Sequence, residues 1–402
     1  MVARRFSPVP TSLGFVLAFL AAFAVPIGCS PQVVDAVDPP FEAAGASSRG
    51  GSGGGAGSGV GATAGNGTAC PDGGSEADRD GDGTLDCADG CPEDPEKQNS
   101  GLCGCGLADT APDGGVTCAD LVSLLAHRFA FKGAGIAVRD TAPGGTAHGE
   151  VVNAELSGDG TLALEGGATE QYADLPNRII STRPAGDPDT GSITLEAWLR
   201  WNGGAAWQRI FDFGDNDGTQ EGQQGGGGIS YLFLTPRTPL EPDLIGAAPQ
   251  NAKLRVAYKR PGSSEYEVTL DAPIQLPSGD LEPTHVAVVV DGTLQRMGIY
   301  INGELQNGSA YFRNVGAGTF TSMTGVYDWS APVPTADGGM VTPPAIDLTV
   351  INDINNWLGR SQFVADNELS GTYYEFRIYS AALTPELVDI SYRGGPDAKF
   401  LQ

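Results

Sequence analysis

The chain has 402 residues, with 49 acidic and 23 basic side chains and a net charge of −26. Its length allows one large domain or two ordinary ones. The charge argues against a nucleic-acid partner, because neutralising phosphates needs clustered Lys and Arg, and the chain has no such cluster. The 59 glycines and 28 prolines predict many turns, at least one linker and few long helices.

The first 28 residues have the pattern of an export signal peptide. Arg4 and Arg5 precede the apolar run Leu13–Val25, which is too short to span a bilayer comfortably. Ile27-Gly28-Cys29 resembles the end of a bacterial lipobox, and the resemblance implies that Cys29 is lipidated and anchors the chain in a membrane. We therefore expect a lipoprotein of the outer membrane or cell surface. The alternative is cleavage after Ala24, which would give a secreted or periplasmic protein.

Residues 29–69 are rich in Gly and Ser and have little apolar content. Such a segment cannot bury enough surface to offset the entropy lost on ordering, so we expect a disordered tether. A tether directly after a lipidated Cys29 would hold a domain away from the membrane. The linker therefore fits the anchored form better than the secreted one.

Residues 70–118 contain six of the seven cysteines. An even number of cysteines in a short exported segment predicts three disulfides, although the spacing leaves their pairing open. The alternative, a zinc site, needs two Cys-x-x-Cys pairs, and the segment contains none. The cysteines expected in disulfides are Cys70, Cys87, Cys91, Cys103, Cys105 and Cys118.

The run Asp78–Asp89 has the residue spacing of a calcium-binding loop. Carboxylates stand at the first, third and fifth positions, and Gly83 supplies the sharp turn at the sixth. Three carboxylates so close together repel one another unless a cation lies among them. The expected ligands are the side chains of Asp78, Asp80, Asp82, Asp86 and Asp89 and the main-chain oxygen of Thr84. The alternative is an acidic, solvated linker without metal.

Together with Cys91-Pro92 and the acidic residues that follow, this run closely resembles a thrombospondin type 3 repeat. The resemblance covers Asp78–Pro95 and implies calcium held by Asp-rich loops that disulfides staple together. Only one such loop is present, whereas the family usually has several in tandem.

From Leu121 onwards the pattern changes to apolar alternation with a period of two, which predicts an all-β domain over residues 121–395. Asp120 is expected to cap a short helix over Leu121–Phe129, and Thr384–Ile390 is expected to form a brief capped helix with Pro385 in its first turn. Ser192–Trp201 is the clearest strand, and His285–Leu305 predicts a hairpin with a type I′ turn at Asn302-Gly303. Because only alternate residues are strongly apolar, we expect one face of this sheet to be open to solvent.

The order of several segments resembles the laminin-G-like, concanavalin A-like jelly roll of bacterial surface proteins. The segments that carry the resemblance are Ser192–Trp198, Arg209–Asp215, His285–Gly292, Gly298–Gly303, Trp357–Arg360, Gly371–Tyr379 and Ser380–Glu386. The resemblance implies an antiparallel jelly-roll β-sandwich with a binding or surface role.

The sequence offers little for catalysis. Retaining glycoside hydrolysis needs two carboxylates close together, and no expected strand carries an acid pair two residues apart on one face. No G-x-S-x-G nucleophile elbow accompanies His127, His148 and His285, and His285 is expected to be a structural core residue. We therefore expect no enzyme activity, with a glycoside hydrolase as the less favoured alternative.

Aromatic residues near the expected loops are the candidates for ligand binding. Trp207, Tyr231, Tyr327 and Trp329 could stack on a sugar ring or a peptide side chain, or could pack internally. For Trp198 and Trp357 packing is expected. These residues and the calcium loop favour a calcium-assisted module that binds carbohydrate or a surface protein, and the alternative is a structural spacer at the cell surface.

Overall fold

A computed structural model describes residues 77–101, 103–106, 115–182, 191–218, 220–240, 252–262, 266–306, 309–314, 327–328, 332–334, 340–341, 343 and 345–401. The expected signal peptide and tether, with Cys29, lie outside these ranges, as do Cys70 and Trp329. No helix within these ranges is both long enough and apolar enough to cross a membrane.

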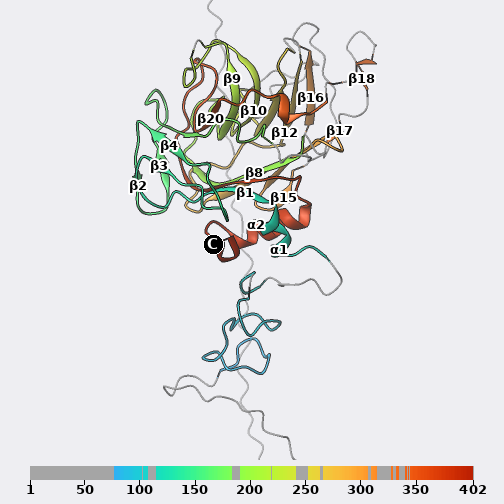
Figure 1. Cartoon of the computed structure of the whole chain (residues 1–402). Helices are drawn as coiled ribbons and strands as arrows, with labels where there is room; N and C mark the ends of the chain where they lie inside the picture. The colour runs from blue at the N-terminus through green and yellow to red at the C-terminus, as the bar shows by residue number, and fades with distance from the viewer. Residues whose placement is uncertain are drawn as a thin grey trace, which may run out of the picture. The chain divides into compact units, whose positions relative to one another are not determined.

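Two antiparallel sheets make up the β-rich part of the chain (Figure 1). In the eight-stranded sheet the order is β1-β21-β8-β13-β14-β15, with β6 paired to β21 and β17 to β14. Its strands are β1 (Leu125–Phe129), β6 (Leu162–Leu164), β8 (Ile193–Trp201), β13 (Thr284–Asp291), β14 (Arg296–Ile301), β15 (Glu304–Leu305), β17 (Tyr327–Asp328) and β21 (Gly371–Tyr379).

The nine-stranded sheet has the order β16-β12-β11-β10-β9-β20-β7-β4-β3. Its strands are β3 (Ala137–Val138), β4 (Gly149–Val152), β7 (Tyr172–Leu175), β9 (Phe211–Asn216), β10 (Gly228–Thr235), β11 (Arg255–Lys259), β12 (Tyr266–Asp271), β16 (Ser309–Asn314) and β20 (Asn355–Leu358). Two short pairs stand apart, β2 (Ala134–Gly135) with β5 (Leu156–Ser157) and β18 (Val333–Pro334) with β19 (Met340–Val341).

The main hydrophobic core lies between the two sheets. Leu195, Val288 and Ile378 enter it from the eight-stranded sheet, and Phe211 and Leu232 enter it from the nine-stranded one. Each is at most 1% exposed, as expected for the inward positions of a sandwich. The expected all-β fold of antiparallel sheets is therefore confirmed.

The predicted hairpin is present between β13 and β14. Val286 pairs with Ile301, and Asn302 donates its backbone N–H to the carbonyl of His285 at the end of this ladder. The chain then reverses at Asn302-Gly303, which joins β14 to β15, where Ile301 pairs with Glu304. Asn302 and Gly303 both have positive φ, at 49° and 79°, which is the conformation that a type I′ turn requires. This sequence signal was therefore read correctly.

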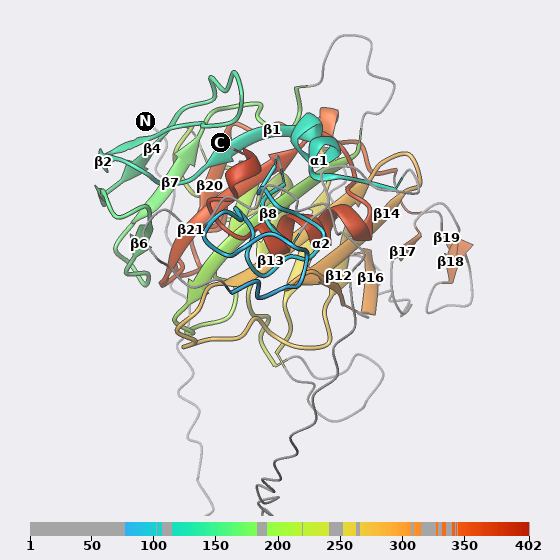
Figure 2. The same ribbon diagram turned by 90° about the horizontal axis from the view of Figure 1, so that it is seen from below.

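The expectation that one face of this sheet is open to solvent is wrong. All five residues of β14 after Arg296 are buried, and in β8 only Arg200 is not. The helix α2 (Pro385–Gly394) covers the face, with Leu387 and Val388 in the same apolar cluster as Ala287 (Figures 1 and 2). Alternation along a strand shows which residues share a face but not what a later segment places on it.

The helix before the sandwich is shorter than expected. The α1 helix (Cys118–Leu124) is capped by Thr117, and Asp120 completes a capping box from the N3 position. Leu125–Phe129 forms strand β1 instead, because these residues pair with β21. The predicted C-terminal helix is confirmed as α2, with Thr384 as its cap and Pro385 in the first turn. Two 3-10 turns, η1 (Leu348–Val350) and η2 (Lys399–Leu401), complete the elements.

Candidate functional site

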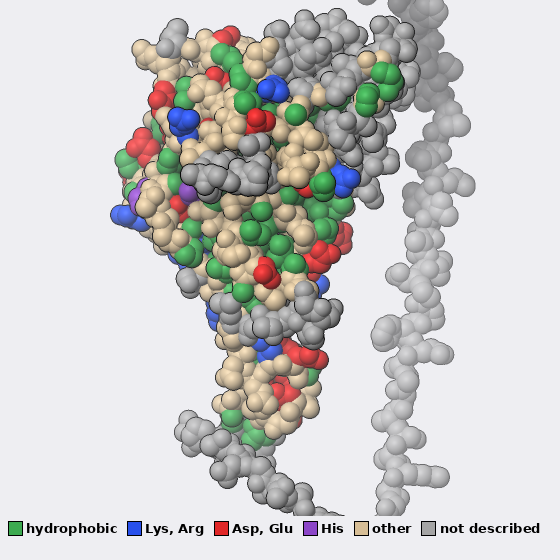
Figure 3. All heavy atoms as spheres, turned by 45° about the vertical axis from the view of Figure 1, so that its right-hand side comes forward, with side chains coloured by type: hydrophobic (Ala, Val, Ile, Leu, Met, Phe, Trp, Pro, Cys, Tyr) green, Lys and Arg blue, Asp and Glu red, His purple; other side chains and the backbone are tan. Residues whose placement is uncertain are grey.

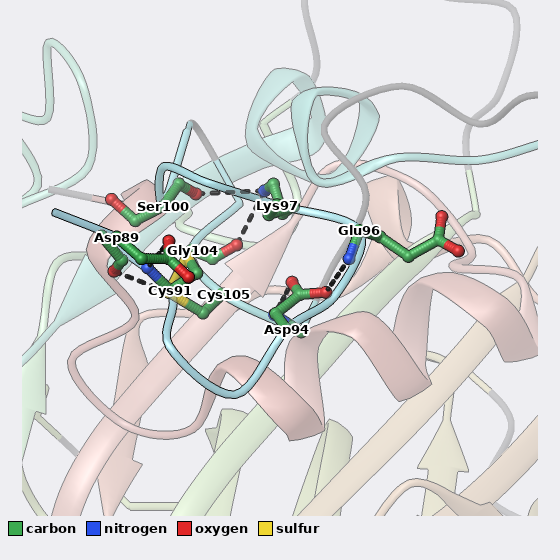
Figure 4. Close-up of a disulfide and its surroundings, with 10 residues drawn as sticks. Asp89, Cys91, Asp94, Glu96, Lys97, Ser100, Gly104 and Cys105 are labelled. Carbon is green, nitrogen blue, oxygen red and sulfur yellow. Dashed lines mark hydrogen bonds between the residues drawn. A yellow bond between two sulfur atoms is a disulfide. The ribbon is translucent and has the colours of Figure 1, made fainter. Parts of the chain in front are cut away.

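Disulfides staple the segment before the sandwich. Cys91 is bonded to Cys105, and Cys103 is bonded to Cys118 at the start of α1. Cys87 is disulfide-bonded as well. Around the Cys91–Cys105 bond, the carboxylate of Asp89 accepts a hydrogen bond from the N–H of Cys91 (Figure 4). The expectation of a disulfide framework is confirmed for these five cysteines.

The acidic loop brings three of its expected calcium ligands together. Carboxylate oxygens of Asp78, Asp80 and Asp82 all lie within 4.8 Å of one another. Backbone donors shape the loop, since Asp78 accepts from the N–H groups of Gly81 and Gly83 at 2.8 and 3.1 Å. The loop thus holds its carboxylates side by side without a basic side chain among them.

One oxygen of this loop has an unusual environment. Oδ2 of Asp80 is shielded from solvent and has no hydrogen-bond partner among the described residues. Desolvation, and then the neighbouring charges of Asp82, Asp89 and Asp78, raise the pKa of Asp80. Asp86 lies differently, because its carboxylate accepts from the N–H of Arg79 at 2.9 Å. Asp78, Asp80 and Asp82 therefore form the centre of the candidate cation site.

The second candidate site is the face of the nine-stranded sheet that points away from the core, here called the outer face. In β9 and β10, Phe213 and Leu232 point inwards, so their neighbours Asp212 and Phe233 point outwards. Strand pairing places outward residues opposite one another in one row across the sheet. In order, the row consists of Glu150, Asp174, Trp357, Asp212, Phe233, Ala257 and Thr269.

Arg209 lies at the middle of the outer face. Its Nε donates to Asp212 at 3.1 Å, and its Nη2 donates to Asp366 at 2.9 Å. The guanidinium carbon lies 4.0 Å from the centre of the Phe233 ring, in cation–π geometry. With its side chain 2% exposed, Arg209 joins β9, β10 and the segment after β20 into one buried cluster.

The carboxyl group of Asp212 is wholly buried beneath this cluster. Burial raises its pKa to about 7, although Arg209 and the N–H of Gln362 stabilise the ionised form. Its Oδ1 has no hydrogen-bond partner among the described residues. Because the group is buried, Asp212 can organise the outer face but cannot touch a ligand there.

Trp207 lies at one end of the outer face and is partly exposed. Its ring centre lies 5.9 Å from the guanidinium of Arg209 and 5.5 Å from that of Arg255. The backbone of Trp207 has φ of +66°, which is uncommon for a bulky residue. Hydrogen bonds hold it there, from its own N–H to the carbonyl of Arg237 and from Arg209 to its carbonyl. The molecule thus fixes a large aromatic ring in a strained conformation beside two arginines.

Carboxylates gather at the end of the row that lies on β4 and β7. Asp174 lies directly opposite Glu150 on the neighbouring strand. Burial, then the charges of Glu150 and Glu221, raise the pKa of Asp174 to about 6. Arg360 is the cation nearby, and it stacks over the rings of Tyr172 and Trp357. This end of the outer face therefore combines acidic side chains with the aromatic rings of Tyr172 and Trp357.

The structure brings two of the four predicted ligand-binding aromatics to the same face. Trp207 and Tyr231 are linked through Arg209 and Phe233, with 5.2 Å between the Tyr231 and Phe233 ring centres. Tyr231 is only 3% exposed and donates its hydroxyl to Glu267, so it supports the face from beneath. The side chain of Tyr327 and all of Trp329 lie outside the described residues.

Residues that sequence reasoning missed supply most of the outer face. Arg209 and Asp212 were read only as part of a strand, and Asp366 had no motif around it. Their signal is the cross-strand register, which joins β9 to β20 and β10 although these strands are far apart in sequence. The search for acid pairs along single strands likewise missed Glu150 and Asp174, which face each other across two strands.

The aromatic residues expected to pack internally do so, and His285 is buried with them. Trp198 and Trp357 are 1% and 0% exposed. His285 is 0% exposed and stacks against Trp198 and Tyr392, with neither ring nitrogen hydrogen-bonded to a described residue. Its role is therefore structural, through ring packing. His127 lies near the surface, and its Nδ1 contacts the carboxylate of Asp140 at 2.9 Å.

On the face drawn in Figure 3, the basic side chains of the described residues stand apart from one another rather than forming a patch.

The sandwich matches a family model over part of its length. A family model described as the concanavalin A-like lectin/glucanases superfamily matches residues 167–340. A search of curated proteins found no match.

Three solved structures are similar to this chain at low sequence identity. The CBM40 module of a Ruminococcus gnavus IT-sialidase, bound to α2,3-sialyllactose, is 14% identical, with 57% of this chain and 95% of that one covered and a TM-score of 0.34. Domain 4 of the Geobacillus stearothermophilus arabinanase AbnA, in complex with arabinotriose, is 17% identical, with 69% and 98% covered and a TM-score of 0.32. Trypanosoma rangeli sialidase is 13% identical, with 72% of this chain but 35% of that one covered and a TM-score of 0.39. The residues matched by the family model lie in the part of the chain that forms the two antiparallel sheets.

Proposed function

We propose that this chain is an exported carbohydrate-binding protein whose ligand lies on the outer face of the nine-stranded sheet. The observation that carries the proposal is the partly exposed Trp207, held beside Arg209 and Arg255 on that face. An aromatic ring fixed before the ligand arrives loses little entropy on binding and stacks on the apolar face of a sugar. The match of residues 167–340 to a family model whose description includes lectins supports this reading.

Binding of a surface protein and a purely structural spacer are the competing functions. A spacer needs no fixed aromatic ring at its surface, whereas Trp207 is retained in a strained backbone conformation. A glycan and peptide array probed with the mature chain separates the three. Binding to glycans supports the proposal, binding to peptides alone favours protein adhesion, and a blank array favours the spacer.

We further propose that the acidic loop binds calcium through Asp78, Asp80 and Asp82. Support comes from the closeness of these carboxylates and from the shielded, unpartnered Oδ2 of Asp80. Thr84, Asp86 and Asp89 stay in the proposed ligand set as the loop spacing requires. The resemblance to a thrombospondin type 3 repeat implies that this calcium ion would also stabilise the disulfide-stapled segment.

Calcium titration by calorimetry is expected to give a Kd on the order of 10⁻⁴ to 10⁻³ M, as in extracellular modules. Asp80→Asn should abolish the heat of binding, because it removes the charge of the central carboxylate. Glu96→Gln is the matched control, since Glu96 is in the same segment and its side chain points away from the disulfide (Figure 4). Absence of heat from the unaltered chain at millimolar calcium would end this proposal.

Anchoring in a membrane through lipidated Cys29 is proposed from the sequence, because the export signal, the lipobox-like run and the tether follow one another. Replacing Cys29 with Ser is expected to move the protein from the membrane fraction to the soluble fraction. An unaltered protein that is already soluble would favour the secreted or periplasmic form.

The binding proposal includes the absence of catalysis. Asp212 is inaccessible to a ligand, and Arg209 occupies both Asp212 and Asp366. Glu150 and Asp174 are a carboxylate pair on adjacent strands of the outer face that a hydrolase could use. If the chain hydrolyses a polysaccharide and Asp174→Asn abolishes that hydrolysis, the function is hydrolysis and not binding.

A further inference from the structure

A carboxylate with one free oxygen lies close to the partly exposed tryptophan. Asp366 belongs to the segment after β20, and its Oδ2 accepts from Nη2 of Arg209 at 2.9 Å and from the hydroxyl of Ser361 at 2.7 Å. Its other oxygen, Oδ1, accepts from no described residue and, unlike Oδ1 of Asp212, is not shielded from solvent. The side chain is 14% exposed. Asp366 therefore presents one fixed acceptor oxygen to the surface.

Arg209 sets the position of this oxygen relative to the Trp207 ring. The same guanidinium donates to Asp366 through Nη2 and to the carbonyl of Trp207 through Nη1. Its carbon lies 5.9 Å from the centre of the Trp207 ring. Arg209 has little freedom to move, because its side chain is 2% exposed and its Nε is bonded to Asp212. The aromatic ring and the free oxygen are thus held at a fixed spacing around one buried side chain.

Asp366 offers more than a counter-charge for Arg209. The wholly buried Asp212 already faces that guanidinium at 3.1 Å, so two carboxylates share one positive charge. Desolvation raises the pKa of Asp366, although Arg209 and the hydroxyl of Ser361 stabilise its ionised form. Water therefore satisfies this carboxylate poorly, and its unused oxygen is a strong acceptor for a hydroxyl group that reaches it.

We propose that Asp366 determines the specificity of the outer face, because its Oδ1 accepts a hydrogen bond from a hydroxyl of the sugar that stacks on Trp207. This inference rests on the proposed carbohydrate-binding function and names the chemical group that the site recognises. The ligand is a sugar unit with a free hydroxyl at the edge of its stacked face. Arg209 is a positioning residue in this arrangement. A sugar without that hydroxyl would leave the carboxylate oxygen covered and without a donor, which is the costly case for a desolvated acceptor.

The test measures by calorimetry how tightly the mature chain binds a glycan identified on the array and analogues of it that each lack one hydroxyl. One analogue is expected to bind the unaltered protein at least about tenfold more weakly than the complete glycan. Asp366→Asn is expected to weaken binding of the complete glycan by a similar factor. The same analogue should then cost this variant nothing further, because the missing hydroxyl and the missing carboxylate belong to one contact.

Asp366→Glu separates the contact from the charge. It keeps a counter-charge for Arg209 but moves the free oxygen by one methylene, so it is expected to remain folded and to lose affinity as Asp366→Asn does. Asp389→Asn is the matched control, since Asp389 is an exposed carboxylate that pairs with Arg393 on α2. This control is expected to bind every glycan as the unaltered protein does.

The outcomes distinguish failure of this inference from failure of the binding function. An unaltered chain that no analogue weakens overturns the inference, as do equal losses for the unaltered chain and Asp366→Asn or full affinity of Asp366→Glu. Each of these leaves the binding function intact if Trp207→Ala still loses affinity. Should Asp366→Asn not fold, Asp366→Glu is compared with the same analogues. An array on which every glycan is blank overturns the binding function and this inference with it.

Discussion

Replacing Arg377 with Met is expected to lower the free energy of unfolding by about 3–5 kcal/mol. Arg377 lies under α2 with none of its side chain exposed, and it contacts both Glu375 and Glu196. It also donates to the hydroxyl of Ser391 and to the carbonyl of Gly395, which ties the C-terminal segment to the sheet. Its loss would leave the buried Glu196 without its arginine, which is the costly half of a buried ion pair, whereas Glu375 would keep Arg128. Equilibrium unfolding in urea measures the change.

Arg393→Met is the matched control, because Arg393 is an arginine on α2 itself. Arg393 pairs with Asp389 four residues earlier, but the two side chains are 61% and 43% exposed. Exposed pairs of this kind contribute about 0.3–0.5 kcal/mol, so this variant should unfold almost as the unaltered protein does. Equal effects of the two substitutions would contradict the view that the buried charges hold α2 in place.

Removing the Cys103–Cys118 disulfide, with Ala at both positions, is expected to lower the free energy of unfolding by about 3 kcal/mol, the value for a loop of about 15 residues. Both cysteines are buried in the apolar cluster that contains Leu121 of α1. The bond therefore ties the cysteine-rich segment to the helix that enters the sandwich. Thermal unfolding followed by near-UV circular dichroism reports on the tertiary packing involved.

The Cys91–Cys105 bond provides the comparison. It closes a loop of similar length but lies wholly within the segment before α1. Ala at both of these positions is expected to leave the unfolding of the sandwich unchanged. A loss of stability equal to that of the Cys103–Cys118 variant would mean that the segment and the sandwich unfold as one unit.

Local patterns in the sequence predicted the parts of the fold that depend on neighbouring residues. Asn302-Gly303 gave the type I′ turn because few residues other than Asn and Gly adopt two successive positive φ angles. Thr384-Pro385 gave the start of α2 through its capping hydroxyl and fixed φ. The strand at Ile193–Trp201 followed from strict alternation.

The errors arose where distant residues decide the outcome. Leu125–Phe129 continues a helical pattern, but pairing with β21 makes it a strand. The covered face of β14 depends on α2, which follows some eighty residues later. The outer face could not be predicted for the same reason, because Asp212 and Trp357 become neighbours only through strand register.

The central claim is that a glycan binds beside Trp207, and the most direct measurement is calorimetric titration of the mature chain and of Trp207→Ala with a glycan found on the array. The substitution is expected to weaken binding by at least about tenfold, or about 1.4 kcal/mol, since it removes the stacking ring. Tyr392→Ala is the control, because Tyr392 is a partly exposed aromatic residue on α2, against the other sheet. The account predicts that Trp207→Ala loses affinity while remaining folded and that Tyr392→Ala binds as the unaltered protein does. Equal affinity of Trp207→Ala and the unaltered chain would contradict it.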